Sequence, residues 1–500
     1  MDSFYTLPWT LSSVLCAVAL MGCAAGPDFE RPASPDVSGY LATPMPVRTT
    51  SAPVALGGSQ QIVDGVEVDT HWWRKLGSNE LNALIKDALE NNPDLEATEA
   101  AVRQAQEQYA AKAGATRIPQ LEGGLIGQRQ RMSPGAVGQP VEMGEYSLYD
   151  TSISVHYTFD LTGGNRRALE ALAARSNYET YRLAGARLTL AANVASAAIT
   201  DASLSGQIEV LEAITRSQHE QLEIDRARVR LGRADQDEVR RLQTQIENNR
   251  AQISALRNLH EHNEHMLAVL VGRPPAAGEL PRFSLGDFNL PTELPLIVPS
   301  ELVRMRPDIL AAEALLHAAN AEYGVAVSNL YPQITISADI GSQALSGGTL
   351  FGGGSAVWSL VGQLTQPLFK PGLPAERRAA LAAFHAAAAN YQSVVLESLR
   401  GVADVLRALE YDARRLAALR AAEVASQASQ DSESRRHMLG ASSYYELLVA
   451  QQRTQQIAIE RVAAQAKRLT NSIAFYQAVA GVDITVNETV VAQSATDFDS

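Results

Sequence analysis

The sequence contains little cysteine, little charge and few aromatic side chains. Its 500 residues include 2 cysteines, 19% charged residues and 6% aromatic residues. Cys16 lies in an apolar N-terminal stretch that we expect to be removed, so Cys23 would be the one cysteine of the mature chain and no disulfide could form within it. The many small and apolar residues that remain are typical of long helices lying close together.

Positive charge is also scarce, with 42 Lys and Arg against 55 Asp and Glu, and the net charge is −13. An acidic chain is repelled by a phosphate backbone, so we expect no nucleic-acid partner. The negative charge would suit a protein whose surface attracts cations, although a role in keeping the protein soluble would also explain it. Outside the N-terminal stretch we find no apolar run approaching the roughly 18 residues of a membrane-spanning helix, and we expect no helix to cross a membrane.

Patterns for catalysis, cofactors and metals are lacking as well. The stretch from His260 to His265 holds three histidines, but not at the metalloprotease spacing, so a solvated helix face explains it better. No Lys-Ser or Lys-Thr follows the glycines of 347–354, which favours a loop tip over a phosphate cradle. No serine or cysteine stands in a recognisable nucleophile setting. We therefore expect no enzyme, no cofactor and no metal site.

The N-terminus resembles a bacterial lipoprotein signal. Residues 11–22 form an apolar run too short to span a bilayer, and Cys23 follows at once. Leu20-Met21-Gly22-Cys23 has the form of a lipoprotein cleavage box, although Asp2 stands where Lys or Arg is usual. We predict a signal peptide over 1–22 and lipid attachment at Cys23, with diacylglycerol and palmitate as the anchor. Ala24, where inner-membrane lipoproteins tend to have Asp, implies the outer membrane.

The chain repeats a pattern of residues in its second half. Asn92-Pro93-Asp94-Leu95 is echoed by Arg306-Pro307-Asp308-Ile309, and further matches follow in the same order at nearly the same spacing. These matches are Tyr109 with Tyr323, Pro119-Gln120 with Pro332-Gln333, Arg166-Arg167 with Arg377-Arg378, and Leu231-Gly232 with Leu439-Gly440. Such a series predicts an internal duplication. Two similar surfaces can occupy equivalent positions in a ring, so we expect the chain to build a wall or a tube.

The duplication and the composition together define the predicted domains. A stretch rich in Pro, Ser, Gly and Thr precedes the first repeat and is typical of an extended arm. The predicted boundaries are 1–22 for the signal peptide, 23–70 for the lipid-anchored extended arm, 71–285 for the first repeat, 286–481 for the second repeat and 482–500 for a C-terminal tail.

Each repeat contains a segment of strict apolar and polar alternation. From Ser152 to Leu161 one face carries Ile, Val, Tyr, Phe and Leu, and the segment 334–340 has the same pattern. With weaker strands near 121–132 and 358–366, we predict hairpins over about 120–162 and about 332–368. An open sheet of four strands leaves unpaired backbone groups in hydrocarbon, and single-chain barrels begin at about eight strands. The strands therefore predict a barrel shared among subunits.

Long helices follow both hairpins. The predicted helices run from 165 to about 230 and from 375 to about 438, and at 1.5 Å per residue each would be about 100 Å long if unbroken. Each reaches a turn and is followed by a second helix that runs back to about residue 271 or 480. An earlier helical segment, 80–115, is interrupted near Asn92-Pro93, which predicts two helices joined at a proline turn.

Several of these motifs, in this order, resemble the lipidated branch of the TolC-like outer-membrane factors. The resemblance covers about residues 20–480. It rests on Trp72-Trp73, the apolar spacing from Leu81 to Leu89, Asn92-Pro93-Asp94-Leu95, Pro119-Gln120, Arg306-Pro307-Asp308-Ile309, and the Leu439-Gly440 turn that leads into Glu446-Leu447-Leu448-Val449-Ala450-Gln451. It implies fold class α+β: a trimeric outer-membrane β-barrel with four strands per chain, continued by a long periplasmic α-helical coiled-coil barrel.

The resemblance also implies a function. It is that of the outer-membrane channel of a tripartite efflux system, a passive exit duct for drugs or other small molecules. The implied partners are two further copies in a homotrimer, a periplasmic adaptor (membrane fusion) protein, an inner-membrane pump of the resistance-nodulation-division class, and outer-membrane lipid. A channel for protein (type I) secretion or metal export, and a structural lipoprotein without a pore, remain as alternatives. The sequence does not name the substrate.

The two helix turns are implied to form the periplasmic mouth. The adaptor-contact tips would be Leu231, Gly232 and Arg233 on one turn and Leu439, Gly440, Ala441 and Ser442 on the other. Tyr445 and Val449 are four residues apart and would share a helix face. The family often has Asp where this chain has Val449, so we expect an apolar constriction at this point rather than an acidic one. Glu446 or Asp235 would supply an acidic ring. Taken alone, each glycine could simply cap a helix.

Overall fold

The computed structural model describes residues 25–65, 69–131, 144–278 and 280–481. The predicted signal peptide 1–22, Cys23 and the predicted C-terminal tail 482–500 lie outside these residues, as do residues 132–143 of the first predicted hairpin. The elements in chain order are β1 (Gln61–Asp64), η1 (Trp72–Leu76), α2 (Asn79–Asn91), α3 (Pro93–Arg117), β2 (Gln120–Arg131), β3 (Glu145–Phe159), α5 (Gly164–Arg230), α6 (Gln236–Leu270), η2 (Leu285–Asp287), β4 (Glu293–Leu296), α7 (Pro299–Met305), α8 (Pro307–Ser328), β5 (Gln333–Ala344), η3 (Gly347–Thr349), β6 (Ala356–Thr365), α9 (Leu373–Met438) and α10 (Tyr444–Val479).

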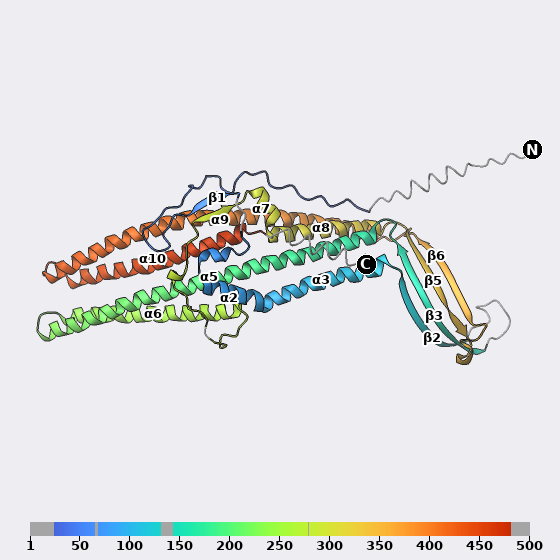
Figure 1. Cartoon of the computed structure of the whole chain (residues 1–500), viewed down its shortest axis with the longest axis horizontal. Coiled ribbons are helices and arrows are strands. Elements are labelled where there is room, and N and C mark those ends of the chain that lie inside the picture. The colour runs from blue at the N-terminus through green and yellow to red at the C-terminus, as the bar shows by residue number, and fades with distance from the viewer. Residues whose placement is uncertain (1–24, 66–68, 132–143, 279, 482–500) are drawn as a thin grey trace, which may run out of the picture. The chain divides into compact units, whose positions relative to one another are not determined.

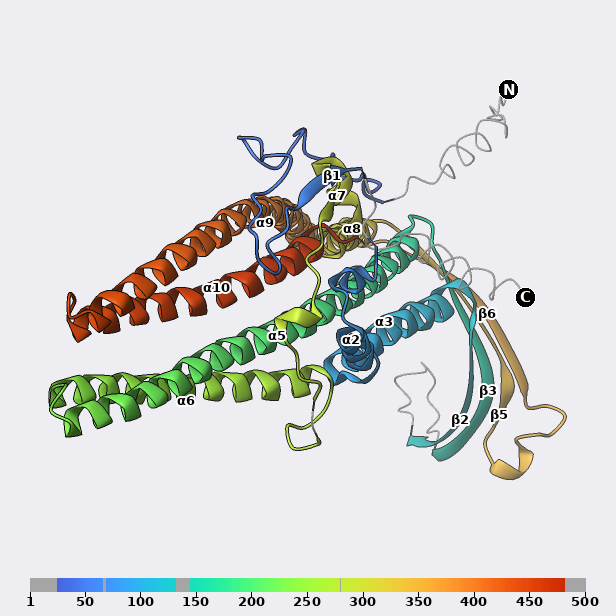
Figure 2. The same cartoon turned by 60° about the vertical axis from the view of Figure 1, so that its left-hand side comes forward.

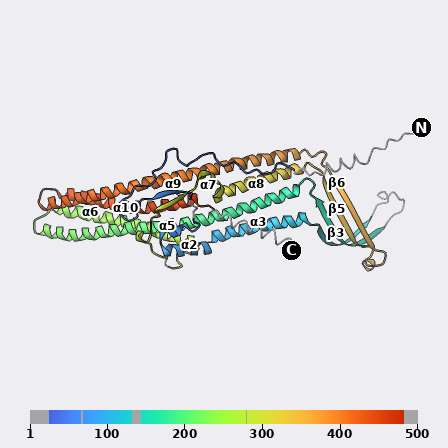
Figure 3. The ribbon, with the colours of Figure 1, turned by 45° about the horizontal axis from the view of Figure 1, so that its top comes forward.

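The long helices predicted from the sequence are confirmed. α5 has 67 residues and α9 has 66, and both end within a residue or two of the predicted limits. The proline turn is also confirmed, because Pro93 is the first residue of α3, as Pro307 is of α8. In all three views α6 returns beside α5, and α10 returns beside α9 (Figures 1, 2 and 3).

Four of the six described strands form one antiparallel sheet in the order β2-β3-β5-β6. The two predicted hairpins are therefore joined into a single sheet by the pairing of β3 with β5, in which Ile153 lies opposite Ile340. Figure 1 shows the four strands side by side in this order. β2 and β6 form the two edges, and every residue of β6 is exposed in the single chain.

The two faces of this sheet differ in chemistry, because the register keeps the alternation aligned across all strands. One face collects apolar side chains: Leu121, Leu125, Ile153, Val155, Tyr157, Phe159, Ile334, Ile336, Ile340, Trp358, Leu360 and Leu364. Many of these are exposed, Trp358 and Leu125 among them. On the other face Asp339 accepts hydrogen bonds from Ser154 and Ser359, over 2.5 and 2.9 Å. The sheet thus has one apolar and one polar face.

The described chain divides into two compact units. Among the described residues, the first unit contains the sheet and comprises those within 25–32, 101–179 and 312–391; the second comprises those within 33–100, 180–311 and 392–481. Each unit draws on both halves of the sequence. The order of helices and strands is similar in the two halves, as the predicted duplication requires, but the duplication itself stays a prediction.

The core of the second unit lies where several helices meet. Trp72, Leu81, Ala195, Leu469 and Tyr476 belong to one buried cluster, in which the rings of Trp72 and Tyr476 stack with centroids 5.5 Å apart. Alanines predominate along α5 in this cluster, and their small side chains let neighbouring helices lie close.

The expectation that no helix crosses a membrane stays a prediction. α5 contains one 18-residue window that is long and apolar enough to cross a membrane by length and composition alone, which the sequence analysis did not anticipate. Nearly half of the window is buried within the chain, so its composition is also that of a core helix.

The segment 33–65 of the predicted arm packs on the second unit. β1 pairs in parallel with β4, with Gln61 opposite Glu293. The buried guanidinium of Arg468 donates hydrogen bonds to the carbonyl oxygens of Leu56 and Gly58, over 2.7 and 2.8 Å. The arm is therefore extended but held against α10 rather than free.

Candidate functional site

Both predicted helix turns have the same backbone geometry. Gly232 and Gly440 adopt φ values of 70° and 74°, in the left-handed region that favours glycine. The Arg233 amide donates to the Arg228 carbonyl over 2.9 Å, and the Ala441 amide donates to that of Arg436 over 2.8 Å. These are the bonds of a Schellman motif, which explains why each glycine ends its helix.

The tips expose apolar side chains. Leu231 is 70% exposed and Leu439 is 84% exposed, each one residue before its glycine. A leucine so exposed at a turn contributes little to the folded single chain. The remaining predicted tip residues, Arg233, Ala441 and Ser442, lie on the same two turns.

The two predicted acidic groups cap the helices that follow the turns. Asp235 is the N-cap of α6 and accepts a hydrogen bond from the Asp237 amide over 3.1 Å. Glu446 completes a capping box at the start of α10, accepting from the Ser443 amide over 2.8 Å. The Ser443 amide, followed by the hydroxyls of Ser443 and Ser442, holds the pKa of the Glu446 carboxyl below its usual value. Glu446 is therefore a stable negative charge at neutral pH.

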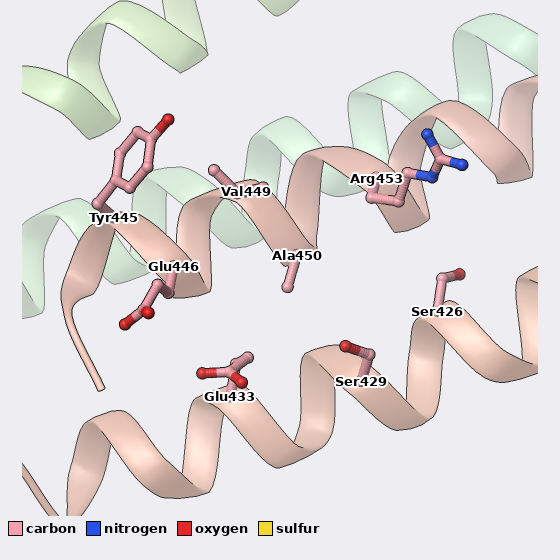
Figure 4. Close-up of a pocket in the computed structure, with 8 residues that line it drawn as sticks. All are labelled: Ser426, Ser429, Glu433, Tyr445, Glu446, Val449, Ala450 and Arg453. Carbon is pink, nitrogen blue, oxygen red and sulfur yellow. The ribbon is translucent and has the colours of Figure 1, made fainter. Parts of the chain in front are cut away.

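Tyr445 and Val449 lie on one exposed face of α10. They are 59% and 46% exposed in the single chain. Figure 4 shows both side chains pointing to one side of α10, whereas Glu446 and Ala450 point toward α9. A groove of about 370 Å³ lies here, lined by Ser426, Ser429, Glu433, Tyr445, Glu446, Val449, Ala450 and Arg453. The structure thus brings together three of the four predicted gate residues, while Asp235 is not among those that line the groove.

Sequence reasoning missed the residue that fixes this face. Tyr444, next to Tyr445, is only 4% exposed, and its hydroxyl donates to Oδ2 of the buried Asp225 on α5 over 2.9 Å. Burial, and then the negative charge of Asp225, raise the pKa of Tyr444 well above its usual value, so it stays a hydrogen-bond donor. Tyr444 packs in a small cluster with Leu222, Val239, Leu242, Ile246, Leu447 and Leu448.

A buried polar chain connects the same helices farther from the tip. Asn249 of α6 donates to Gln218 of α5, and Gln455 of α10 donates to Asn249, each over 2.8 Å. Buried amides bonded to one another help to fix the rotation and the register of packed helices, although Oε1 of Gln455 has no hydrogen-bond partner among the described residues. The available signal in the sequence was the placement of Asn249 and Gln455 among apolar positions of their helices.

One cluster outside the tips has the residue types of a metal site. Asp201 of α5 and His260 and Glu264 of α6 place potential ligand atoms within 4.8 Å of one another. The stretch from His260 to His265 does not by itself reveal this cluster, because Asp201 is 59 positions away from His260 in the chain but adjacent to it in space.

Comparison with known proteins matches most of the chain. The family model described as outer membrane efflux protein matches residues 84–273 and 298–481. The pyoverdine export outer membrane protein OpmQ of Pseudomonas putida is 29% identical over 419 residues, which is 83% of this chain and 88% of that protein. The outer membrane protein OprJ of Pseudomonas aeruginosa is 29% identical over 451 residues, covering 88% of this chain and 89% of that protein.

Solved structures share the fold. The outer-membrane channel CmeC of Campylobacter jejuni superimposes with a TM-score of 0.83 at 19% identity, covering 93% of this chain and 98% of that one. At this level of identity the similarity shows only that the two chains share the same arrangement of helices and strands.

Proposed function

Because this chain belongs to the outer membrane efflux protein family, the TolC-like outer-membrane factors, and works as an outer-membrane efflux channel, we propose that three copies form one passive duct. Each copy contributes four strands to a twelve-stranded barrel in the outer membrane. The long helices continue the duct as a coiled-coil barrel into the periplasm. The duct performs no chemistry, and the free energy for transport comes from a partner pump.

The observation that carries this proposal is the open sheet with one apolar face. The edge strands β2 and β6 present unpaired backbone groups, each of which costs several kcal/mol in hydrocarbon. Pairing β6 of one copy with β2 of the next satisfies both edges, and it turns the apolar face toward lipid. The polar face, with Asp339 and its serine partners, then lines the lumen.

We assign the gate to Tyr445 and Val449. Both side chains are exposed on one face of α10 in the single chain. This leaves them free to meet the same side chains of the other two copies around a three-fold axis. Glu446 and Asp235 lie close in sequence to the same tips and would add negative charge at the mouth. The Tyr444 to Asp225 bond would hold this face in the closed position.

The adaptor protein would bind the two tips. The contact would involve Leu231, Gly232 and Arg233 on one tip and Leu439, Gly440, Ala441 and Ser442 on the other. Leu231 and Leu439 offer exposed apolar side chains there. An inner-membrane pump of the resistance-nodulation-division class would complete the assembly. Cys23 would carry the lipid anchor, which mass spectrometry of the mature N-terminal peptide can test.

We propose small molecules as cargo. Relatives named for pyoverdine export and for efflux pumps favour small solutes over secreted proteins. A passive duct needs no binding pocket for its cargo, so selectivity would come from the gate and from the charge of the lining.

Single-channel recordings in planar bilayers test the duct and its gate. Tyr445→Ala combined with Val449→Ala is expected to raise conductance several-fold and to sensitise the host to large antibiotics. Val424→Ala, an exposed apolar position on α9, is the matched control and is expected to leave both unchanged. Unaltered conductance in the double variant would refute the gate, and a purified protein that stays monomeric in mild detergent would refute the shared barrel.

A further inference from the structure

Asp201, His260 and Glu264 lie at the contact between α5 and α6. Asp201 Oδ1 is 3.0 Å from Nε2 of His260, and Glu264 Oε1 is 3.8 Å from Nδ1 of the same ring. His260 and Glu264 are four residues apart, so both project from one face of α6 toward α5. All three residues belong to the second compact unit.

Asp201 is buried without a full set of partners. Asp201 is only 3% exposed, and its Oδ2 accepts a hydrogen bond from the Phe283 amide over 3.3 Å, with the Asn263 side chain also close to the carboxylate. Oδ1 has no hydrogen-bond partner among the described residues, although Nε2 of His260 is close, because the geometry between them is not that of a hydrogen bond. A buried carboxylate oxygen in this state is costly unless a proton or a cation neutralises it, and that cation is either a protonated His260 or a bound ion.

We propose that Asp201, His260 and Glu264 bind a divalent transition-metal ion, and that Zn²⁺ fits the donor set best. One imidazole and two carboxylates are ligand types that Zn²⁺ accepts at about 2.0–2.2 Å. An ion between Asp201 Oδ1 and Nε2 of His260 has these two ligands in place. The half-exposed Glu264 side chain lies nearest to Nδ1, on the other side of the ring, and would change rotamer to become the third ligand. The Ser205 hydroxyl now hydrogen-bonds to Nε2 of His260 over 3.0 Å, and on metal binding it would release this nitrogen and could bond to a water in the fourth position.

Such an ion would join three separate segments of the chain. Asp201 brings α5, and His260 and Glu264 bring α6. The Phe283 amide that supports Asp201 belongs to the connector after α6. A metal ligand that also accepts a hydrogen bond from a neighbouring group, as Asp201 does from Phe283, is held in the orientation that the metal needs, which is common around zinc. Binding would therefore stabilise the packing of this helix pair.

Isothermal titration of the full mature chain in detergent, stripped with EDTA and placed in a non-chelating buffer at neutral pH, tests the site. We expect one Zn²⁺ per chain, a micromolar dissociation constant and a higher thermal unfolding midpoint with Zn²⁺. His260→Ala is expected to weaken binding at least about tenfold and to abolish the thermal shift. The combined variant His262→Ala and His265→Ala is the matched control, because both side chains are exposed on α6, and it should bind within about twofold of the parent.

Several outcomes would overturn the proposal. These are no saturable Zn²⁺ binding by the parent chain, parent-like binding by His260→Ala, or equal loss in the His262 and His265 control. Circular dichroism in EDTA establishes that each variant is folded. Should His260→Ala fail to fold, Glu264→Gln alters a half-exposed side chain, and unchanged binding in that variant would count against the site in the same way.

Discussion

Adjacent tyrosines at the start of α10 have opposite environments. Tyr444 is buried and bonded to Asp225, whereas Tyr445 faces away and is mostly exposed. The sequence predicted that Tyr445 and Val449 share a face of the helix, but it could not predict which of the two adjacent tyrosines is buried. Their phase is set by packing of α10 against α5 and α6, which requires contacts over more than 200 positions in the chain.

Tyr444→Phe is expected to lower the free energy of unfolding by about 2 kcal/mol, because it leaves Oδ2 of a fully buried carboxylate without a donor. Gln221 and Arg228 approach the other oxygen of Asp225 and do not replace the lost bond. Thermal or urea unfolding of the purified protein measures the effect.

Tyr445→Phe is the control for this change, since it removes the same hydroxyl from an exposed position. We expect it to alter stability by less than about 0.5 kcal/mol. Equal effects of the two substitutions would mean that the Tyr444 to Asp225 bond does not stabilise the tip.

At the scale of elements, the turns were predictable because their chemistry is local. A glycine following a long helical pattern indicates a left-handed cap, and both Gly232 and Gly440 adopt one. The strands were predictable for a similar reason, since alternation is a property of neighbouring residues. The pairing of β3 with β5 was not, because it joins the two halves of the chain.

Gly440→Ala tests the cap without a steric contribution, since a Cβ there meets nothing within 4 Å. The left-handed backbone alone should cost about 1 kcal/mol of unfolding free energy. Gly401→Ala, in the interior of α9 and equally open, should instead stabilise by about 0.5–1 kcal/mol through helix propensity. Thermal midpoints that move in the same direction for both variants would contradict this account of the turn.

At the scale of the whole molecule, the N-terminal arm depends on residues near the other end of the chain. Arg468 is almost fully buried and donates to Leu56, Gly58 and Gln60, while Gln60 donates to Ser472 over 2.9 Å. The sequence predicted an extended arm from its composition. It held no signal that an arginine more than 400 positions away would fix the arm in place.

Arg468→Met is expected to release the arm, because the carbonyl oxygens of Leu56 and Gly58 lose their charged donor. Backbone amide hydrogens of residues 49–61 should then exchange at least about tenfold faster, while those of α5 change little. Lys467→Met, at the exposed neighbouring position, is the control and should leave exchange unchanged. Protection that survives Arg468→Met would show that β1 pairing with β4 is sufficient to hold the arm.

The sequence by itself determined the helices, the turns, the strands and their alternation, because these depend on residues close together in the chain. It also determined the resemblance to a family, which rests on the order of such local motifs. Tertiary structure alone decided that two hairpins form one sheet, which tyrosine is buried, where Arg468 binds and that Asp201 meets His260. Each of these depends on contacts between distant segments, and the balance of packing and hydrogen bonding that selects such contacts leaves no local pattern in the sequence.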